Sequence, residues 1–220
     1  MRWPFTPFGT STLLACVAGL AGISAVLWWA TGSPAVAAAP APLLLFVLNF
    51  FRDPERHAEG GELDLVSPAD GLVSDIVQVD DPALGAPCTR IGVFLNVFDV
   101  HVNRVPCSAE VVRVEHRAGL CLDARHPRAS EQNRAATLVL ARPDGRLVAV
   151  RQITGLIARR IICPSRVGQR YGRGERYGMI RFGSRTELVL PRAEVAEVHV
   201  AVGQRVRGGE TLLARLRPAP

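Results

Sequence analysis

Three polar residues in this chain are of types that can do chemistry together: Ser184 in the segment RFGSRTELVLP, His101 in FDVHVNRVP and Asp70 in SPADG. A serine hydroxyl becomes a good nucleophile when a base takes its proton, and a histidine oriented by a carboxylate is the usual base. Each residue also has a structural interpretation. Gly-Ser and Asp-Gly pairs mark turns, and a histidine on an alternating strand is often only packed there. The residue types alone leave both interpretations open.

The segments around these residues read as short strands separated by Gly, Pro and Asp. β-branched residues and partial alternation predict strands over 65–79, 91–98, 111–114, 137–140 and 147–153. Pro143-Asp144-Gly145 is typical of a hairpin turn between the last two. The stretch 116–133 is polar and irregular, and we expect a long loop there. The sequence therefore predicts a mainly β domain.

A short repeat near the end of the chain refines this prediction. Residues 167–175 read VGQRYGRGE and residues 202–210 read VGQRVRGGE, and each copy lies between two strand-like apolar stretches. Two such units packed together resemble the hammerheads of biotinyl- and lipoyl-type barrels. We therefore expect a barrel-sandwich (lipoyl/hammerhead-like) β-domain. The exposed lysine that those carriers need is absent from this sequence.

The N-terminal region differs sharply from the rest of the chain. Its first 51 residues hold a single charge, Arg2, and the stretch 11–30 is uncharged and mostly apolar. That stretch is long enough to cross a bilayer core of about 30 Å. A second apolar run over 35–51 predicts a helical membrane hairpin. A secretory signal peptide is the alternative, but its apolar core would be unusually long.

We therefore predict two regions, a membrane anchor of one or two apolar helices over 1–51 and the β-domain over 52–220. Basic residues favour the cytoplasmic side of a membrane. Arg2 and the cluster over 52–56 would both lie there. We expect the protein at the cell (inner) membrane, with its β-domain on the cytoplasmic side.

All 26 basic residues are arginine, and the chain contains no lysine. No side-chain amine can therefore hold pyridoxal phosphate or carry biotin or lipoate. The net charge of +6 is modest and aromatic residues are few, which argues against a nucleic-acid groove. Arginine pairs well with carboxylate and phosphate, so anionic lipid head groups are a reasonable partner. The five cysteines form no CxxC pair, and we expect reduced thiols and no metal site.

Three motifs follow an apolar N-terminus in this order: SPADG at 67–71, FDVHVNRVP at 98–106 and RFGS at 181–184. Together they resemble the phosphatidylserine decarboxylases, specifically the short (type A) form, and the resemblance spans essentially everything from 51 to 220. It implies a lyase of phospholipid biosynthesis that converts phosphatidylserine to phosphatidylethanolamine and CO2. It also implies that the chain is made as a zymogen.

In that family the protein cuts its own Gly-Ser bond. The resemblance thus implies cleavage between Gly183 and Ser184 into a large N-terminal and a small C-terminal chain that stay associated. Ser184 Oγ would attack the Gly183 carbonyl, and the serine would end as a covalent pyruvoyl group (pyruvate) on the new N-terminus. Glycine leaves that carbonyl open to attack because it has no Cβ. The substrate amine would form a Schiff base with the pyruvoyl carbonyl, so no lysine is needed.

The resemblance assigns Asp70 and His101 to the activation of Ser184, and Asp99 is an equal candidate for the orienting carboxylate. Longer members of the family carry a second histidine three residues after the first. Here that position is Arg104. Either His101 serves both self-cleavage and decarboxylation, or the division of roles differs, and Arg104 is then a candidate to bind the phosphate or the carboxylate of the substrate.

Three other functions are possible but fit less well. A non-catalytic lipoyl-like binding module would keep its chain intact. A metallopeptidase would want a His-x-His pair, but position 103 is Asn. A serine hydrolase would carry a GxSxG elbow, which is missing. Within the decarboxylase interpretation, the sequence leaves open archaetidylserine as the substrate, the number of membrane passes, a homo-oligomer and the group that protonates the product.

Overall fold

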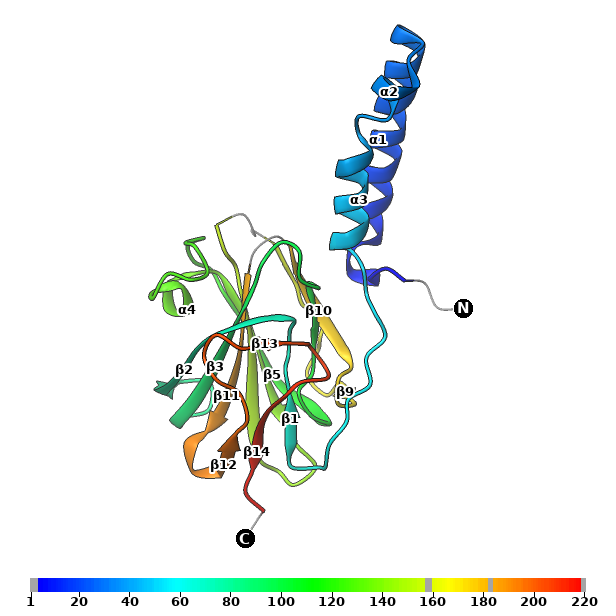
Figure 1. The fold of residues 1–220 in the computed structure, drawn as a ribbon. Helices are drawn as coiled ribbons and strands as arrows, with labels where there is room; N and C mark the ends of the chain where they lie inside the picture. Colours follow the sequence, from blue (N-terminus) through cyan, green and yellow to red (C-terminus); the bar gives the residue numbers. More distant parts are fainter. Residues whose placement is uncertain (1–3, 157–159, 182–183, 219–220) are drawn as a thin grey trace. The chain divides into compact units, whose positions relative to one another are not determined.

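The structure, a computed structural model, describes residues 4–156, 160–181 and 184–218. The chain forms two compact units, Met1–Pro54 and Glu55–Pro220. The first unit is helical, and its long helix runs beside two shorter ones (Figure 1). Its elements are η1 (Pro7–Gly9), α1 (Thr10–Thr31), α2 (Pro34–Ala37) and α3 (Ala41–Phe50).

Helix α1 ends where the sequence provides a glycine. Gly32 has a φ of 62°, and its N–H donates to the carbonyl of Trp28, which is a common way for helices to end. Among the described residues, Pro7–Thr31 is the one helix long and apolar enough to cross a membrane, and the apolar helix Pro34–Phe50 is shorter. The apolar helix expected over 11–30 is confirmed and points to membrane association. The number of passes and the side of the membrane stay predictions.

The second unit is mainly β, as expected. Its strands are β1 (Asp64–Val66), β2 (Gly71–Asp81), β3 (Ala86–Leu95), β4 (Val102–Arg104), β5 (Ala109–Arg117), β6 (Ala135–Ala141), β7 (Leu147–Ile153), β8 (Arg160–Ile162), β9 (Arg170–Tyr171), β10 (Arg176–Arg181), β11 (Ser184–Pro191), β12 (Val195–Val198), β13 (Arg205–Val206) and β14 (Leu212–Leu216). Two short helices, α4 (Ala129–Gln132) and η2 (Arg192–Glu194), lie between strands.

Within the described residues these strands form three sheets. The large sheet has eight strands in the order β13-β2-β3-β11-β7-β6-β5-β9, and the small sheets have the orders β4-β10-β8 and β1-β14-β12. The predicted hairpin is confirmed, because β6 and β7 pair around Gly145, whose φ is 80°. The loop expected over 116–133 is wrong at its start, since β5 continues to Arg117. The residues of β5 there are polar because they are exposed while its backbone pairs with β6.

The two copies of the repeat occupy equivalent places at the two edges of the large sheet. Gly168 in the first copy donates to the carbonyl of Val111 on β5, and Gly203 in the second donates to the carbonyl of Val73 on β2, both at 2.8 Å. The strand that follows, β9 or β13, then pairs with the same neighbour. The repeat therefore adds one short strand to each edge of the sheet.

The two copies also meet each other. Gly174 and Gly209 have φ values of 73° and 78°, a conformation that side chains strain. A Cβ added to Gly174 would lie 3.4 Å from the carbonyl oxygen of Gly209. The turns after β9 and β13 are thus in contact, although the described strands do not close the large sheet into a hydrogen-bonded barrel.

The central strand β11 separates two different environments. Leu188 and Leu190 belong to the main hydrophobic core, which also contains Ile91 and Leu138 from neighbouring strands. Val189 packs in a smaller cluster. Alternate residues of a strand point to opposite faces, so Ser184 lies on the same face of β11 as Leu188.

Candidate active site

Ser184 is the first residue of β11, where it pairs with Leu95 of β3. Its side chain is fully buried, and Oγ has no hydrogen-bond partner among the described residues. Gly183 lies outside the described residues. The preceding strand, β10, pairs with β4 and β8, whereas β11 pairs with β3 and β7. The interpretation of Gly-Ser as a simple hairpin turn is therefore wrong, because the flanking strands belong to different sheets.

His101 precedes β4 and is also fully buried. Its Nδ1 lies 2.9 Å from the backbone oxygen of Asp99. A carbonyl oxygen only accepts, so Nδ1 carries the proton, and a neutral ring then presents Nε2 as a proton acceptor. The carboxylate of Asp99 instead accepts from Arg205 and from the backbone of Asn96, each at 2.9 Å. Asp99 therefore orients His101 through its backbone, and not through the carboxylate that the sequence suggested.

A buried hydrogen bond relates the segment of His101 to that of Ser184. Asn103, two residues after His101, donates from Nδ2 to Oγ1 of Thr186, two residues after Ser184, over 3.1 Å. The β4–β10 pairing continues back to His101, whose carbonyl accepts from the N–H of Ile180. Because residues two apart in a strand share a face, His101 and Ser184 face the same interior.

The side chain of Gln152 extends this polar group to β7, donating to Oδ1 of Asn103 over 2.7 Å. Gln152, Asn103 and Thr186 are all fully buried. A Cβ on Gly178 would lie 3.0 Å from Nε2 of Gln152 and 2.3 Å from the carbonyl oxygen of Ile162. Glycine is thus needed there. Reasoning from sequence missed these three polar residues, although their alternation within apolar strands is a usable signal.

Asp70 lies just before β2, at the same end of the large sheet as Ser184. One carboxylate oxygen accepts from Arg56 over 2.8 Å, and the other accepts from the N–H of Gly208 over 2.7 Å. Arg56 also binds Glu210 over 2.8 Å. Strand β3 lies between β2 and β11, so the backbones at Asp70 and Ser184 are separated by two strand spacings, about 10 Å. The described contacts thus hold Asp70 to the second repeat.

Arg104 is buried, with 3% of its surface exposed. It donates to the carbonyl of Gly174 over 2.9 Å, and a Cβ on Gly209 would lie 2.7 Å from its Cδ. Its side chain therefore runs along the contact between the two repeats. A role for Arg104 toward the substrate stays a prediction.

The opposite face of β11 carries a buried network of charges. Glu187 is fully buried and binds Arg185 at 2.9 Å, Arg151 at 3.1 Å and Arg90 at 3.5 Å. Arg185 reaches Asp75 with both of its terminal nitrogens. Burial alone would raise the pKa of Asp75, but the hydrogen bonds and charge of Arg185 outweigh it and lower the pKa. This network fixes β11 against its neighbours from behind the site.

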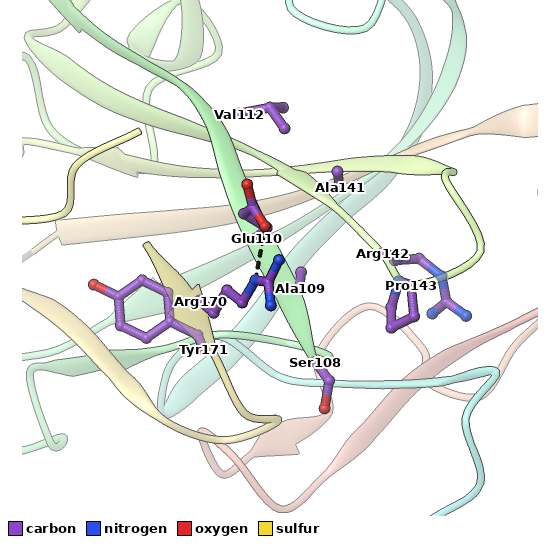
Figure 2. Close-up of a pocket in the computed structure, with 9 residues that line it drawn as sticks. All are labelled: Ser108, Ala109, Glu110, Val112, Ala141, Arg142, Pro143, Arg170 and Tyr171. Carbon is purple, nitrogen blue, oxygen red and sulfur yellow. Dashed lines mark hydrogen bonds and ion pairs between the residues drawn. The ribbon is translucent and has the colours of Figure 1, made fainter. Parts of the chain in front are cut away.

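A pocket of about 530 Å³ lies at the other end of the large sheet (Figure 2). An ion pair between Glu110 and Arg170 crosses it, at 2.8 Å. Ala141, which lines the pocket, pairs with Leu147 at the start of β7. Ile153, which pairs with Arg185, lies six residues further along β7. That is about 20 Å along the strands. This pocket is therefore not part of the candidate active site.

Known proteins resemble this chain over most of its length. The family model for phosphatidylserine decarboxylase matches residues 43–214, a range that includes Asp70, His101 and Ser184. A protein of Rhodopirellula baltica is 45% identical over 198 residues, covering 89% of this chain and 80% of that protein. One of Trichlorobacter lovleyi is 44% identical over 214 residues, covering 97% and 94%. One of Geobacter sulfurreducens is 44% identical over 197 residues, covering 88% of each.

The chain belongs to the phosphatidylserine decarboxylase family. Each of these three relatives is named phosphatidylserine decarboxylase proenzyme. Membership makes the chain an enzyme, a decarboxylase, and the resemblance read from its three motifs is confirmed. The binding module, the metallopeptidase and the serine hydrolase find no support among these relatives.

Proposed function

We propose that this decarboxylase converts phosphatidylserine to phosphatidylethanolamine and CO2 with a pyruvoyl group made from its own Ser184. The observation that carries the proposal is the environment of that serine. Its hydroxyl is buried without a partner among the described residues, and it shares an interior face with His101. Buried hydroxyls are normally hydrogen-bonded, so a functional explanation is favoured.

The first step is self-cleavage. Nε2 of His101 takes the proton of Ser184 Oγ, and Oγ attacks the carbonyl carbon of Gly183. His101 then gives this proton to the amide nitrogen of Ser184, which leaves as an amine, so an ester now joins the two parts of the chain. Loss of the Ser184 Cα proton expels the Gly183 carboxylate and leaves dehydroalanine. Water then replaces the nitrogen, which departs as ammonia.

The two products would remain one protein because the sheet holds them together. Residues 184–220 contribute β11, which pairs with β3 and β7 of the larger chain. They also contribute β13 and β14, which pair with β2 and β1. Cleavage before Ser184 breaks none of these pairings. This supports a large and a small chain that stay associated.

The surroundings of Ser184 fit a pyruvoyl group. The strand fixes its Cα, and its side-chain oxygen is buried without a hydrogen-bond partner among the residues that the structure describes. When formed, the group supplies a carbonyl that accepts the electrons left behind by CO2. His101 is available on the same face to hold or return a proton, and Arg104 is the cation we assign to the substrate phosphate or carboxylate.

We extend the proposal to the fold and the location. The contact between Gly174 and Gly209 supports a barrel-sandwich domain built from two hammerhead-like halves. The apolar helix Pro7–Thr31 supports an anchor in the cell membrane. The positive-inside rule then favours a β-domain on its cytoplasmic side. Archaetidylserine remains the alternative substrate.

The test is CO2 release from carboxyl-labelled phosphatidylserine by the wild type, Ser184→Ala and Ser165→Ala. Ser165 is a matched control, because its buried hydroxyl contacts Tyr171 at 2.8 Å. We expect activity in the wild type and in Ser165→Ala and none in Ser184→Ala. Normal activity in Ser184→Ala would overturn the proposal. A labelled archaetidylserine assayed in parallel decides the lipid backbone.

A further inference from the structure

We propose that loops at the Ser184 end of the large sheet form a membrane rim, defined by Phe98, Leu120 and Leu156, that inserts into the head-group region of an anionic bilayer. The proposal rests on the proposed function, because it takes the substrate to be a lipid that stays in its membrane. It assigns to the β-domain a lipid contact of its own, in addition to the apolar N-terminal helices.

The strand register places the three residues at one end of the sheet. Strand β3 ends at Leu95, opposite Ser184, and Phe98 follows in the next loop. Strand β7 ends at Ile153, opposite Arg185, and Leu156 follows it. Strand β5 ends at Arg117, which pairs with Ala135 of β6. Ala135 also pairs with Ile153, so the end of β5 is level with the end of β7. Leu120 follows β5, so all three loops leave the sheet at the level of Ser184. Figure 1 shows the β3–β4 connection and α4 at this end.

These three side chains are unusually exposed for their size. Phe98 is 65% exposed, Leu156 64% and Leu120 55%. Large apolar residues gathered around a functional end of a protein mark an interaction surface more often than scattered ones do. Aromatic and leucine side chains are also those that insert at a bilayer interface.

The turn that presents Phe98 is held firmly. The N–H of Phe98 donates to Oδ1 of Asn96, and the N–H of Asn96 donates to the carboxylate of Asp99. Asp99 is held in turn by Arg205 over 2.9 Å. These bonds fix the backbone of the turn, so Phe98 stays exposed at its tip. The turn therefore loses little conformational freedom when the phenylalanine inserts into a bilayer.

The charges around the membrane rim indicate what kind of surface it binds. Among the described residues in and beside the three rim loops, arginines outnumber acids. The arginines are Arg125, Arg128, Arg134, Arg160 at the start of β8, and Arg205, and the acids are Asp99, which pairs with Arg205, Asp123 and Glu131. Basic residues close to a bilayer are attracted to anionic lipid. The apolar side chains of the membrane rim, with arginines around them, therefore fit an anionic lipid surface. They fit a second copy of this arginine-rich chain less well.

The chemistry of the substrate requires such a contact. A lipid with two acyl chains does not leave its bilayer readily, because each CH2 exposed to water is unfavourable. The end of the domain that carries Ser184 must therefore come to the head groups. A rim that inserts between them would hold that end at the interface.

The experiment uses the full-length, self-cleaved enzyme in liposomes of phosphatidylcholine and phosphatidylglycerol. Wild type, the double variant Phe98→Ser/Leu156→Ser and the control Val167→Ser are compared. Val167 is 66% exposed, and it precedes Gly168, whose N–H donates to the carbonyl of Val111 near the start of β5, at the end of the strand remote from Ser184. Each enzyme is given long-chain phosphatidylserine within the bilayer, and separately dihexanoyl phosphatidylserine dissolved in water.

We expect the double variant to lose about tenfold or more in kcat/KM for the bilayer lipid, with less than a twofold change for the soluble one. The control should change neither. Equal losses on both lipids would overturn the rim, because the loops would then serve the site itself. Unchanged activity on both would also overturn it.

A second readout does not depend on activity. The variants Phe98→p-benzoylphenylalanine and Val167→p-benzoylphenylalanine are irradiated in the same liposomes, and intact masses are measured. We expect lipid adducts at position 98 and not at 167. Adducts to a second protein chain at position 98 would contradict the proposal. If neither lipid is decarboxylated by the wild type, the proposed function fails, while the lipid adducts still decide the rim.

Discussion

The side chain of Asn103 donates a hydrogen bond to that of Thr186 across 3.1 Å, and both side chains are fully buried. The bond joins the strand that follows His101 to the strand that begins with Ser184. Gln152 fixes Asn103 from the other side. We infer that this contact sets the position of the proposed base relative to the proposed nucleophile.

Replacement of Thr186 by valine tests that inference. The variant keeps the shape of the side chain but removes the acceptor of Asn103, and an unsatisfied buried donor costs about 1–3 kcal/mol. We expect self-cleavage to slow by about tenfold or more, since reactivity depends on sub-ångström positioning. The rate is read from intact masses over time.

Thr89→Val is the matched control. Thr89 is buried on β3 and is hydrogen-bonded to Gln78 at 3.1 Å, but it pairs with Leu190, far from Ser184 along the strands. Its melting temperature should fall less than that of Thr186→Val, because Gln78 is exposed and water can replace the lost partner, while cleavage stays normal. Equal cleavage rates in both variants would mean that the Asn103 contact serves stability alone.

The role of His101 can be separated from its packing with His101→Asn. An asparagine amide can still donate to the backbone oxygen of Asp99 but cannot act as a base. We expect a folded protein that remains a single chain. His199→Asn, which changes a partly exposed histidine near Glu197, should cleave normally. Efficient cleavage of His101→Asn would remove His101 from the mechanism.

The buried charge network should matter for stability. Glu187→Gln would leave Arg90, Arg151 and Arg185 crowded around a neutral amide, and breaking a buried ion pair from one side costs about 3–5 kcal/mol. Denaturant unfolding in detergent measures the loss. Glu110→Gln, which breaks an exposed pair with Arg170, should cost less than about 1 kcal/mol. Similar losses in the two variants would contradict this account.

A further pair predicts sensitivity to acid. The hydrogen bond from Arg215 lowers the pKa of Asp64 from 3.8 to about 2. A carboxyl whose pKa is lower in the folded protein stabilises the fold above about pH 4, and that contribution disappears as the pH falls toward 2. Because the Arg215 side chain is 52% exposed, solvent screening keeps the effect small.

Arg215→Gln should therefore reduce the free energy of unfolding at pH 6 and leave it nearly unchanged at pH 2. Denaturant titrations of the wild type and the variant at both values provide the measurement. If the free energies of unfolding of the wild type and the variant differ by the same amount at both pH values, the ion pair does not account for the acid sensitivity.

Local patterns in the sequence predicted much of this fold. The stretch 147–153 coincides with β7, the hairpin at Gly145 forms, and the repeats form matching edge strands. These features depend on residues close together in the chain. The motifs around Asp70, His101 and Ser184 led to the family in the same way.

Long-range pairing was beyond such reasoning. Nothing local indicates that β10 and β11 join different sheets on either side of the Gly-Ser pair. Asn103, Gln152 and Thr186 come from three separate strands, and their contact depends on how the small sheet packs on the large one. The backbone oxygen of Asp99 as the partner of His101 likewise depends on turn geometry.

The most direct test of the account is the intact mass of the full-length wild type and of Ser184→Ala. We predict that the wild type separates into residues 1–183 and a small chain from residue 184 onward that lacks the serine amine. Ser184→Ala should remain one chain. A correctly folded wild type that also remains one chain would contradict the account at its centre.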